Sequence, residues 1–423
     1  MTDRDEISIK DLGARGDGIG TDGHGESHFV KSALPGERWR PDGNDGFKLI
    51  APIEQRVTPV CGHFGTCGGC VAQHMREDLY ASWKLGIVQK EFERRGIDPG
   101  HLEIADVPMR SRRRCVLSAV RDGDEVRLGF HVARSHDIVD LAECPVLVPG
   151  IVGSFRLLRS IADVLLGSSG TLRFTVLACE HGLDIDVGGQ YVPLGEDRRR
   201  KLVEVVQAQG VARLTADGDV IAQFAAPSLR VGGFSVPVPS GAFVQAVGAA
   251  EEAMAADVAA AAADAKYVAD LFCGIGTFAL TLARTARVLA IDSDRPAVAA
   301  LDAARKTAQG LKPIDARRRD LIREPLSRKE LEGFGCVVFD PPRAGAEAQA
   351  WAVSKSKVPV VVAVSCNPAT LARDSRLLLD GGYQLQRLRV IDQFRYSAQI
   401  ECVAVFRRDD RRRGRARTMP ARS

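Results

Sequence analysis

One cysteine stands where a nucleophile would be expected. Cys366 follows the apolar stretch 358–364, and its neighbours Ser365 and Asn367 are polar. A cysteine at a strand end, near a helix N-terminus, can have a depressed pKa and attack as a thiolate. A single cysteine is more commonly a small buried hydrophobe, but such a residue would lie inside the apolar run. The position therefore favours a nucleophile.

Two carboxylates also stand where apolar strands begin or end. Glu401 interrupts the start of the apolar stretch 400–406, where a charge is costly unless it is used or paired. It could be a general base, and the alternative is a salt-bridged edge residue. Asp340 follows the apolar stretch 336–339 and precedes two prolines, which stiffen the loop. A carboxylate there would project into the crevice above the strand ends, where open α/β sheets bind ligands.

A glycine turn follows another apolar strand, at 267–272. Gly274 and Gly276 would allow a sharp bend and the close approach of a ligand before the next helix. The third glycine of the dinucleotide fingerprint is absent, and Asp292 ends the following strand, where it could hold ribose hydroxyls. The pattern suits a nucleoside-bearing cofactor without a pyrophosphate. The alternative is a tight turn that binds nothing.

Three of the ten cysteines crowd together as Cys61, Cys67 and Cys70. In a cytoplasmic chain such crowding suits metal ligands better than disulfides, and an iron–sulfur cluster needs a fourth thiolate. Cys144 is the best candidate, because cysteine followed by proline recurs as the distal ligand in ferredoxin runs. Cys115, inside a basic strand, is its rival. From spacing alone, four cysteines could equally form a structural zinc site.

The elements that must position these residues change in character along the chain. Short strands with glycine turns predict a small β-barrel over 1–58, with strands at 7–12, 28–30 and 47–51. The segment 59–240 is interpreted as a mixed α+β middle domain with helices at 75–95 and 151–166. The strands expected in this middle domain are 114–120, 125–131, 173–178, 183–187 and 229–238.

From 241 to 408 the pattern changes to apolar strands that alternate with helices. An alanine-rich helix is expected at 246–264. This alternation predicts a parallel sheet covered on both faces, and thus an α/β fold. The last two strands, 385–391 and 400–406, are predicted to pair as a hairpin at the sheet edge.

The amino-acid composition excludes a wholly disordered chain. Of the 423 residues, 45% are hydrophobic and 26% are charged. No apolar run approaches the roughly 18 to 20 residues that span a bilayer, and no apolar signal core is present, so we expect a cytoplasmic protein without a membrane partner.

The net charge is +4, and six arginines in 409–423 predict a basic disordered tail. Arginine outnumbers lysine. Two explanations are open: binding to RNA or DNA, whose phosphates arginine contacts well, or a GC-rich genome.

Taken together, these residues resemble the RNA uracil-5-methyltransferases that use S-adenosylmethionine, over nearly the whole chain. The most specific match is 365–374, which is similar to the family's nucleophile signature. The glycine turn at 270–277 resembles the family's cofactor loop, and 340–343 resembles its catalytic-acid loop. Residues 243–245 are similar to a Phe-x-Gln-x-Asn cofactor motif, with Val247 in place of its asparagine.

The resemblance extends to the N-terminal half. Residues 9–39 resemble a TRAM domain, a small OB-like RNA-binding barrel, and 61–74 is similar to the iron–sulfur loop of the ribosomal members. Members that modify tRNA lack both as a rule, so the resemblance implies a 23S ribosomal RNA substrate. We expect a monomer that binds RNA and a 4Fe–4S cluster. The implied cluster ligands are Cys61, Cys67, Cys70 and Cys144.

The resemblance also implies a Rossmann-like methyltransferase domain and a covalent mechanism. Uracil C5 is too weak a nucleophile to attack a methyl sulfonium, so Cys366 first adds to C6 and creates an enolate. The enolate takes the methyl group, Glu401 removes the C5 proton, and the thiolate leaves. Asp340 would hydrogen-bond the uracil edge or position the cofactor, and the target base must be single-stranded or flipped out. The implied cofactor-site residues are Gln245, Phe272, Thr277, Asp292, Asp320 and Asp340.

The stretch before Glu401 departs from the family. A Pro-His-Thr-x-His stretch usually precedes the catalytic glutamate, and residues 395–399 replace it here. The Asn-Gly-Leu stretch before the third strand is altered at 309–311. The alternatives are methylation of a tRNA uridine, methylation of cytosine C5 in RNA, and a non-catalytic RNA-binding or assembly factor with a degenerate methyltransferase fold.

Overall fold

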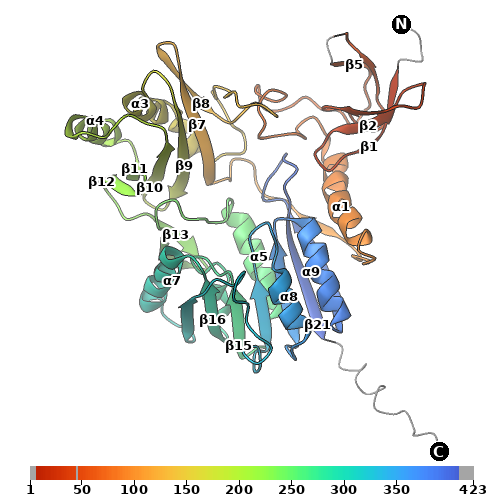
Figure 1. Ribbon diagram of the computed structural model, residues 1–423, viewed down its shortest axis with the longest axis vertical. Coiled ribbons are helices and arrows are strands. Elements are labelled where there is room, and N and C mark those ends of the chain that lie inside the picture. Colours follow the sequence, from red (N-terminus) through yellow and green to blue (C-terminus); the bar gives the residue numbers. More distant parts are fainter. Residues whose placement is uncertain (1–5, 44–45, 409–423) are drawn as a thin grey trace, which may run out of the picture.

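The computed structural model describes residues 6–43 and 46–408. Its strands form sheets of five, six and eight strands and a separate two-stranded hairpin. The five-stranded and six-stranded sheets lie at the top of Figure 1 and the eight-stranded sheet lies below them. In the described ranges, no helix is both long and apolar enough to cross a lipid bilayer. The basic tail expected at 409–423 lies outside the described residues.

The N-terminal sheet is antiparallel, with the strand order β3-β2-β1-β4-β5. The sheet curls so far that its two edge strands come close together. The ring centroids of His28 on β3 and Phe47 on β5 are 6.1 Å apart. A curled sheet is compatible with the expected barrel, although no hydrogen-bonded pairing closes it within the described residues. Its strands are β1 (Ile7–Leu12), β2 (Gly18–Thr21), β3 (Ser27–Val30), β4 (Arg38–Pro41) and β5 (Phe47–Ala51).

Strands β2 and β4 were not predicted, and β2 shows why. It lies in a stretch whose glycines indicated only turns. A Cβ on Gly18 would lie 2.8 Å from Ala33, and a Cβ on Gly20 would lie 2.7 Å from Ile7. The two glycines therefore mark a close approach inside the sheet, where any side chain would clash.

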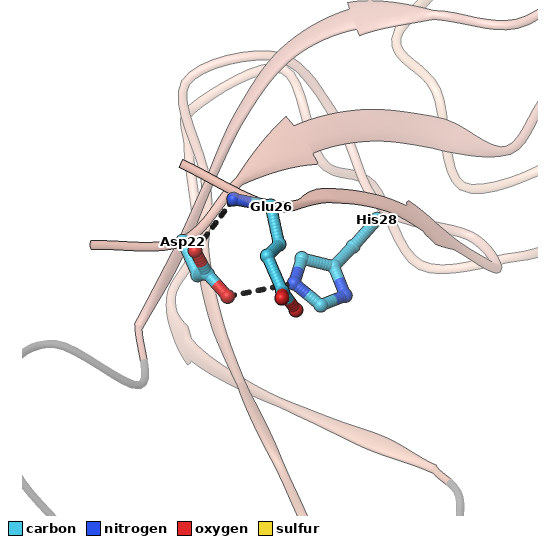
Figure 2. A group of neighbouring side chains, drawn as sticks. All are labelled: Asp22, Glu26 and His28. Carbon is cyan, nitrogen blue, oxygen red and sulfur yellow. Dashed lines mark hydrogen bonds and ion pairs between the residues drawn. The ribbon is translucent and has the colours of Figure 1, made fainter. Parts of the chain in front are cut away.

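The turn between β2 and β3 is closed by the side chains of Asp22 and His28 (Figure 2). One carboxylate oxygen of Asp22 accepts the backbone N–H groups of His24 and Glu26, each at 2.9 Å. The other accepts Nε2 of His28 at 3.0 Å. The hydrogen bond from His28 and these two backbone bonds lower the pKa of Asp22 to about 2. These contacts explain why the polar residues Asp22, Glu26 and His28 lie together: they stabilise the turn.

The middle sheet has the strand order β12-β11-β10-β9-β7-β8. Helices α2 (Pro149–Gly153), α3 (Phe155–Leu165) and α4 (Glu196–Val206) pack against it. The single helix predicted at 151–166 is wrong, because the chain divides at Ser154, whose hydroxyl donates to the carbonyl of Ile151 at 2.7 Å. The strands are β7 (Arg114–Asp122), β8 (Glu125–Gly129), β9 (Thr171–Cys179), β10 (Gly182–Gly189), β11 (Val211–Ala216) and β12 (Asp219–Gln223).

The single strand predicted at 229–238 is instead a hairpin of β13 (Ser228–Val231) and β14 (Phe234–Pro237). Gly232 and Gly233 form its turn with φ values of +56° and +88°. Both values lie in the left-handed region, which glycine adopts without strain and which tight hairpin turns require.

The eight-stranded sheet has the order β17-β16-β15-β18-β19-β21-β20-β6, and β21 alone runs antiparallel to its neighbours. The predicted parallel sheet is confirmed. The chain proceeds outward from β15 in one direction and then from β18 in the other, which creates a switch point where such sheets bind ligands. The strands are β6 (Glu103–Ala105), β15 (Tyr267–Leu271), β16 (Arg287–Asp292), β17 (Ile314–Arg318), β18 (Cys336–Phe339), β19 (Val360–Ser365), β20 (Tyr383–Ile391) and β21 (Glu401–Arg408).

Helices cover both faces of this sheet, as the continuous apolar strands predict. Successive residues such as Val268 and Ala269 pack into two separate cores on opposite faces. On one face lie α5 (Gly248–Ala261), α6 (Ala279–Leu282) and α7 (Arg295–Thr307). On the other face lie α1 (Glu77–Glu93), α8 (Glu347–Ser354) and α9 (Pro368–Asp380).

The C-terminal hairpin of β20 and β21 forms as predicted, but its placement at the sheet edge is wrong. The outer side of β20 pairs with β6, where Val390 lies opposite Ile104. This short strand covers the backbone groups that β20 would otherwise expose. Both α1 and β6 thus pack with the C-terminal sheet, although they precede it by more than a hundred residues in the sequence.

Candidate active site

A cavity of about 440 Å³ lies at the carboxyl ends of β15, β16, β18 and β19. It is therefore at the switch point of the sheet. The structure brings together around it all the residues that sequence reasoning proposed for cofactor binding and catalysis. They are Gln245, Phe272, Thr277, Asp292, Asp320, Asp340, Cys366 and Glu401.

The glycine turn and Asp292 are fixed against each other. The N–H of Gly274 donates to one carboxylate oxygen of Asp292 at 2.9 Å, and the N–H of Asp294 donates to the other at 2.8 Å. Gly276 has a φ of +100°, and a Cβ there would lie 2.5 Å from the side chain of Leu301. Glycine is thus required at this position by both conformation and space. The helix after the turn, α6, is only four residues long.

The lining of the cavity is rich in acid. Among the described residues that line it, Arg343 is the one Arg or Lys side chain, against five carboxylates. Backbone N–H groups hold one of these, Asp320, through bonds of 3.0 and 3.3 Å to a single oxygen. Such a lining favours a cationic ligand. The carboxylates belong to Asp292, Asp294, Asp320, Asp340 and Glu401.

Asp340 is held by an amide. Nε2 of Gln245 donates to Oδ2 of Asp340 at 3.1 Å. Burial raises the pKa of Asp340 to about 7, and this hydrogen bond from Gln245 opposes the rise. The backbone of Gln245 is itself anchored, because its carbonyl oxygen accepts the Nε–H of Arg113 at 3.1 Å, and Arg113 pairs with the buried Glu251 at 2.9 Å. Near neutral pH Asp340 can therefore either donate or accept a proton.

Cys366 lies between the end of β19 and the start of α9, and it is partly buried. Burial raises the pKa of its thiol to about 11, the carboxylates of Glu401 and Asp340 add to the rise, and Arg343 opposes it. The depressed pKa expected from the helix N-terminus is therefore wrong for the protein without ligands. Burial and the two neighbouring carboxyl groups therefore disfavour the thiolate of Cys366.

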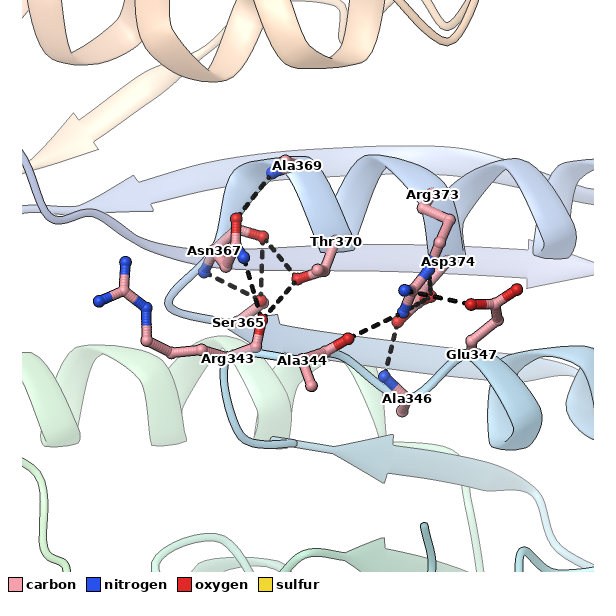
Figure 3. Close-up of polar contacts among 10 residues, drawn as sticks. All are labelled: Arg343, Ala344, Ala346, Glu347, Ser365, Asn367, Ala369, Thr370, Arg373 and Asp374. Carbon is pink, nitrogen blue, oxygen red and sulfur yellow. Dashed lines mark hydrogen bonds and ion pairs between the residues drawn. The ribbon is translucent and has the colours of Figure 1, made fainter. Parts of the chain in front are cut away.

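The polar residues around Cys366 tie the start of α9 to the loop after β18 (Figure 3). The side chain of Asn367 caps α9, and its Nδ2 donates to the carbonyl of Arg343 at 3.0 Å. Further along the helix, Asp374 accepts the backbone N–H of Ala346 at 2.8 Å. These contacts fix the loop that carries Asp340 relative to the loop that carries Cys366.

Glu401 is the first residue of β21 and is buried. The antiparallel register pairs Cys402 with Ser365, so the start of β21 meets the end of β19 just before Cys366. Burial raises the pKa of Glu401 well above its usual range, Asp340 adds to the rise, and a hydrogen bond from Gln393 opposes it. Glu401 and Asp340 thus form an interacting pair of carboxylates in one buried site.

Gln393 is a site residue that sequence reasoning missed. It is buried in the segment between β20 and β21, and its Nε2 donates to Gln245 at 2.8 Å and to Glu401 at 3.2 Å. A lone glutamine carries no spacing signal. The only pointer in the sequence was the unusual stretch that follows it, at 395–399.

A buried ion pair anchors the segment that leads to Glu401. Nζ of Lys84, on α1, lies 2.9 Å from one oxygen of Asp392, and both side chains are almost fully buried. The hydroxyl of Tyr80 donates to the other oxygen of Asp392 at 2.6 Å. Lys84 also donates to the carbonyl of Gln399 at 2.6 Å. Removing one partner of such a pair would leave an uncompensated buried charge, so the segment is held firmly on α1.

The four cysteines proposed as cluster ligands line a second cavity, of about 590 Å³. The loop that carries the first three is fixed to later segments. The N–H of Gly68 donates to the carbonyl of His131 at 2.9 Å, and the N–H of Gly62 donates to Glu143 at 2.7 Å. The second contact places the loop beside Cys144. The rival Cys115 also lines this cavity but is 1% exposed.

The separation of these sulfur atoms bears on the kind of metal site. In the described part of the chain, no three cysteine sulfurs lie mutually within 4.8 Å. Four thiolates on a tetrahedral zinc ion, each at about 2.3 Å, would lie about 3.8 Å apart. The arrangement is therefore wider than a preformed zinc site.

Comparisons with known proteins identify relatives of this chain. A family model described as tRNA (Uracil-5-)-methyltransferase matches residues 203–409. Over 95% of its length the chain is 43% identical to an uncharacterized RNA methyltransferase of Brucella suis, of which it covers 97%. It is 33% identical to the 23S rRNA (uracil(1939)-C(5))-methyltransferase RlmD of Aeromonas salmonicida, over 95% of this chain and 96% of that protein. The chain belongs to the RNA uracil-5-methyltransferase family.

A solved structure shows the same fold for this RNA uracil-5-methyltransferase over nearly its whole length. The Pyrococcus abyssi tRNA (uracil-54, C5)-methyltransferase, in complex with S-adenosyl-L-homocysteine, matches with a TM-score of 0.73 and 20% identity. The match covers 96% of this chain and 100% of that chain.

Proposed function

We propose that this chain transfers a methyl group from S-adenosylmethionine to C5 of a uridine in RNA, through a covalent bond between Cys366 and C6. The observation that carries the proposal is the meeting of the Cys366 thiol with the buried carboxylate of Glu401 and the partly buried carboxylate of Asp340, on the cavity that the glycine turn also lines. Burying a carboxylate costs stability. A factor that only bound RNA would gain nothing from that arrangement.

The residues of the cavity fit the cofactor. S-adenosylmethionine carries a positive sulfonium and an ammonium group, and the acid-rich lining suits both charges. Asp292, held by two backbone N–H groups, would accept the ribose hydroxyls, as carboxylates at this position of such sheets do. Phe272, Thr277 and Asp320 would line the rest of the site. When bound, the cofactor supplies an electrophilic methyl group.

Cys366 begins the reaction on the uracil ring. Its Sγ adds to C6, and the electrons of the C5–C6 double bond move to give an enolate whose charge is shared with C5. The thiol proton has to leave in the complex, because the pKa of the free thiol is raised to about 11. The carboxylate of Asp340, with a pKa raised to about 7, is able to take it near neutral pH.

Glu401 completes the reaction. After methyl transfer, C5 carries both the methyl group and a proton. Glu401 removes that proton, the electron pair restores the C5–C6 double bond, and Cys366 leaves C6 as a thiolate. The register of β21 against β19 supports this role, because it brings the start of β21 to the residue before Cys366.

The proposed substrate is 23S ribosomal RNA. The support is the 33% identity to a relative named for that RNA, over almost the whole of both proteins. Basic side chains around the cysteine-lined cavity would contact phosphates, although such contacts do not distinguish sequences. These side chains belong to Arg15, Lys31, Arg112, Arg114 and Arg134.

Transfer of a labelled methyl group separates the candidates. The purified protein is incubated with labelled S-adenosylmethionine and unmodified transcripts of 23S rRNA or tRNA, and each RNA is digested to nucleosides. We expect label in 5-methyluridine from 23S rRNA. Label in tRNA would identify the tRNA alternative, label in 5-methylcytidine would identify a cytosine enzyme, and no label would leave a binding factor.

We further propose that Cys61, Cys67, Cys70 and Cys144 hold a 4Fe–4S cluster. The four residues fit such a group because they line one cavity and their loops are hydrogen-bonded to each other. Four thiolates are the donor set that iron–sulfur clusters use. The cavity is separate from that of Cys366, which supports a structural or RNA-positioning role.

Anaerobic purification is expected to give a brown protein with about four iron atoms per chain. Cys144→Ser should lose most of the iron and the visible absorbance, because one ligand is missing. Cys115→Ser is the matched control and should retain both. Stoichiometric zinc without visible absorbance would contradict the cluster, and iron loss in the Cys115 variant alone would move the fourth ligand to that residue.

A further inference from the structure

Gln393 is a buried glutamine whose amide contacts two residues of the cavity wall and the backbone of Val247. The residue is 2% exposed. Its Nε2 donates to Oε1 of Gln245 at 2.8 Å and to Oε2 of Glu401 at 3.2 Å. Its Oε1 accepts the backbone N–H of Val247 at 3.3 Å. Both polar atoms of the amide therefore have partners, and Nε2 has two in the active-site cavity.

These contacts fix the direction of the amide. A backbone N–H only donates, so Val247 requires the amide oxygen on its side and turns Nε2 toward Glu401. Gln245 is oriented in the same way, because its own Nε2 donates to Asp340 at 3.1 Å. The two amides thus direct their N–H groups at the carboxylates of Glu401 and Asp340.

We propose that Gln393 is the positioning residue of the catalytic base, holding one oxygen of Glu401 so that the carboxylate is directed at the C5 proton. The inference rests on the proposed function and deepens it. Gln393 acts through Glu401 and not on the substrate.

The step that depends on Gln393 is the loss of the C5 proton. The C5–H bond breaks, the proton passes to Glu401, the electron pair forms the C5–C6 double bond, and the bond from C6 to Cys366 breaks to release the thiolate. A hydrogen bond from an amide N–H favours the ionised carboxylate, which is the form that accepts a proton. Without it, burial and Asp340 would raise the pKa of Glu401 further.

The other groups that act on Glu401 come from the neighbouring strands. Asp340 follows β18, Cys366 follows β19, and Cys402 is the next residue of β21. Lys84 of α1 interacts with Cys402 and is itself paired with Asp392. Among the described residues, Gln393 is the side chain that donates a hydrogen bond to Glu401.

Gln393→Met tests the proposal, since it removes the donor and keeps the length of the side chain. The full-length enzyme, RNA and labelled cofactor are mixed for a single turnover at a series of pH values, and methyl transfer and decay of the covalent complex are followed separately. We expect near-normal methyl transfer and decay about tenfold slower, the size expected for one lost hydrogen bond to a charged group. The acid limb of the decay profile should move to higher pH.

Gln393→Glu places a third carboxylate beside Glu401 and should move that limb further than the methionine does. It also provides the test if the methionine variant does not fold. Gln349→Met is the matched control, because Gln349 is a buried glutamine of α8 whose side chain, within the described ranges, is bonded to the backbone of Leu326 alone, at 2.8 and 3.3 Å. It should lower stability and leave the decay profile unchanged.

The outcomes separate this inference from the function on which it rests. Wild-type decay and pH dependence in both Gln393 variants would exclude the positioning role. Equal losses in methyl transfer and decay, without a pH shift, would show a merely structural role and would also exclude it. If the wild-type enzyme forms no covalent complex with uridine in RNA, the proposed function fails, whatever the variants do.

Discussion

Replacing Cys366 with alanine is expected to lower methyl transfer by at least about 10⁴-fold, as removal of a nucleophile does. Without the bond to C6, C5 of uracil gains no negative charge and does not attack a methyl group. The direct measurement uses RNA that contains 5-fluorouridine. Fluorine at C5 prevents loss of a proton, so the wild-type enzyme should remain attached to this RNA on a denaturing gel, and Cys366→Ala should not.

The matched control is Cys336→Ala. Cys336 is buried at the start of β18, at the end of the strand away from the cavity, so its loss should leave the covalent complex intact. A complex that persists in Cys366→Ala would contradict the assignment. The nucleophile would then be sought at Cys273, which also lines the cavity.

Glu401→Gln is expected to methylate once and then stay bound to the RNA. Glutamine cannot take the C5 proton, so release should slow by about 10² to 10⁴, the usual contribution of a general base. In the wild type, burial raises the pKa of Glu401, and the ionised form is the active one. Release should therefore slow as the pH falls through this raised pKa, and the glutamine variant should lack that dependence. Single-turnover measurements of methyl transfer and complex decay check both expectations.

Glu93→Gln is the control for this variant, because Glu93 is exposed at the end of α1. It should turn over as the wild type does. Unchanged turnover of Glu401→Gln, with no trapped complex, would move the base to another group. Asp340 would be tested next, since its pKa is raised to about 7 and it lines the same cavity.

Much of the candidate site could be predicted because its residues stand at strand ends. Asp292, Asp340 and Cys366 each end or follow an apolar strand, and parallel strands present their carboxyl ends at one edge of a sheet. Apolar runs are visible in a sequence, so the residues that follow them can be identified before their arrangement is known. The same reasoning predicted the parallel sheet. It missed β6, because a strand of three residues has no measurable periodicity.

The contacts that position the catalytic groups and shift their pKa values could not be predicted from the sequence, because they join distant parts of the chain. Lys84 and Asp392 are about three hundred residues apart in sequence, and nothing in either neighbourhood indicates a buried ion pair. The role of Gln393 likewise follows only from its hydrogen-bond partners, which the sequence does not show. The pKa of Cys366 was predicted in the wrong direction for the same reason, since it is raised by burial and by carboxylates that come from other strands.

The most direct test of the account is mass-spectrometric mapping of 23S ribosomal RNA from cells with and without the gene. The account predicts that one 5-methyluridine disappears in the deletion strain. It should return with the wild-type gene and not with Cys366→Ala. An unchanged set of 5-methyluridines in 23S rRNA, together with loss of a methylated uridine from tRNA or of a 5-methylcytidine from either RNA, would contradict it.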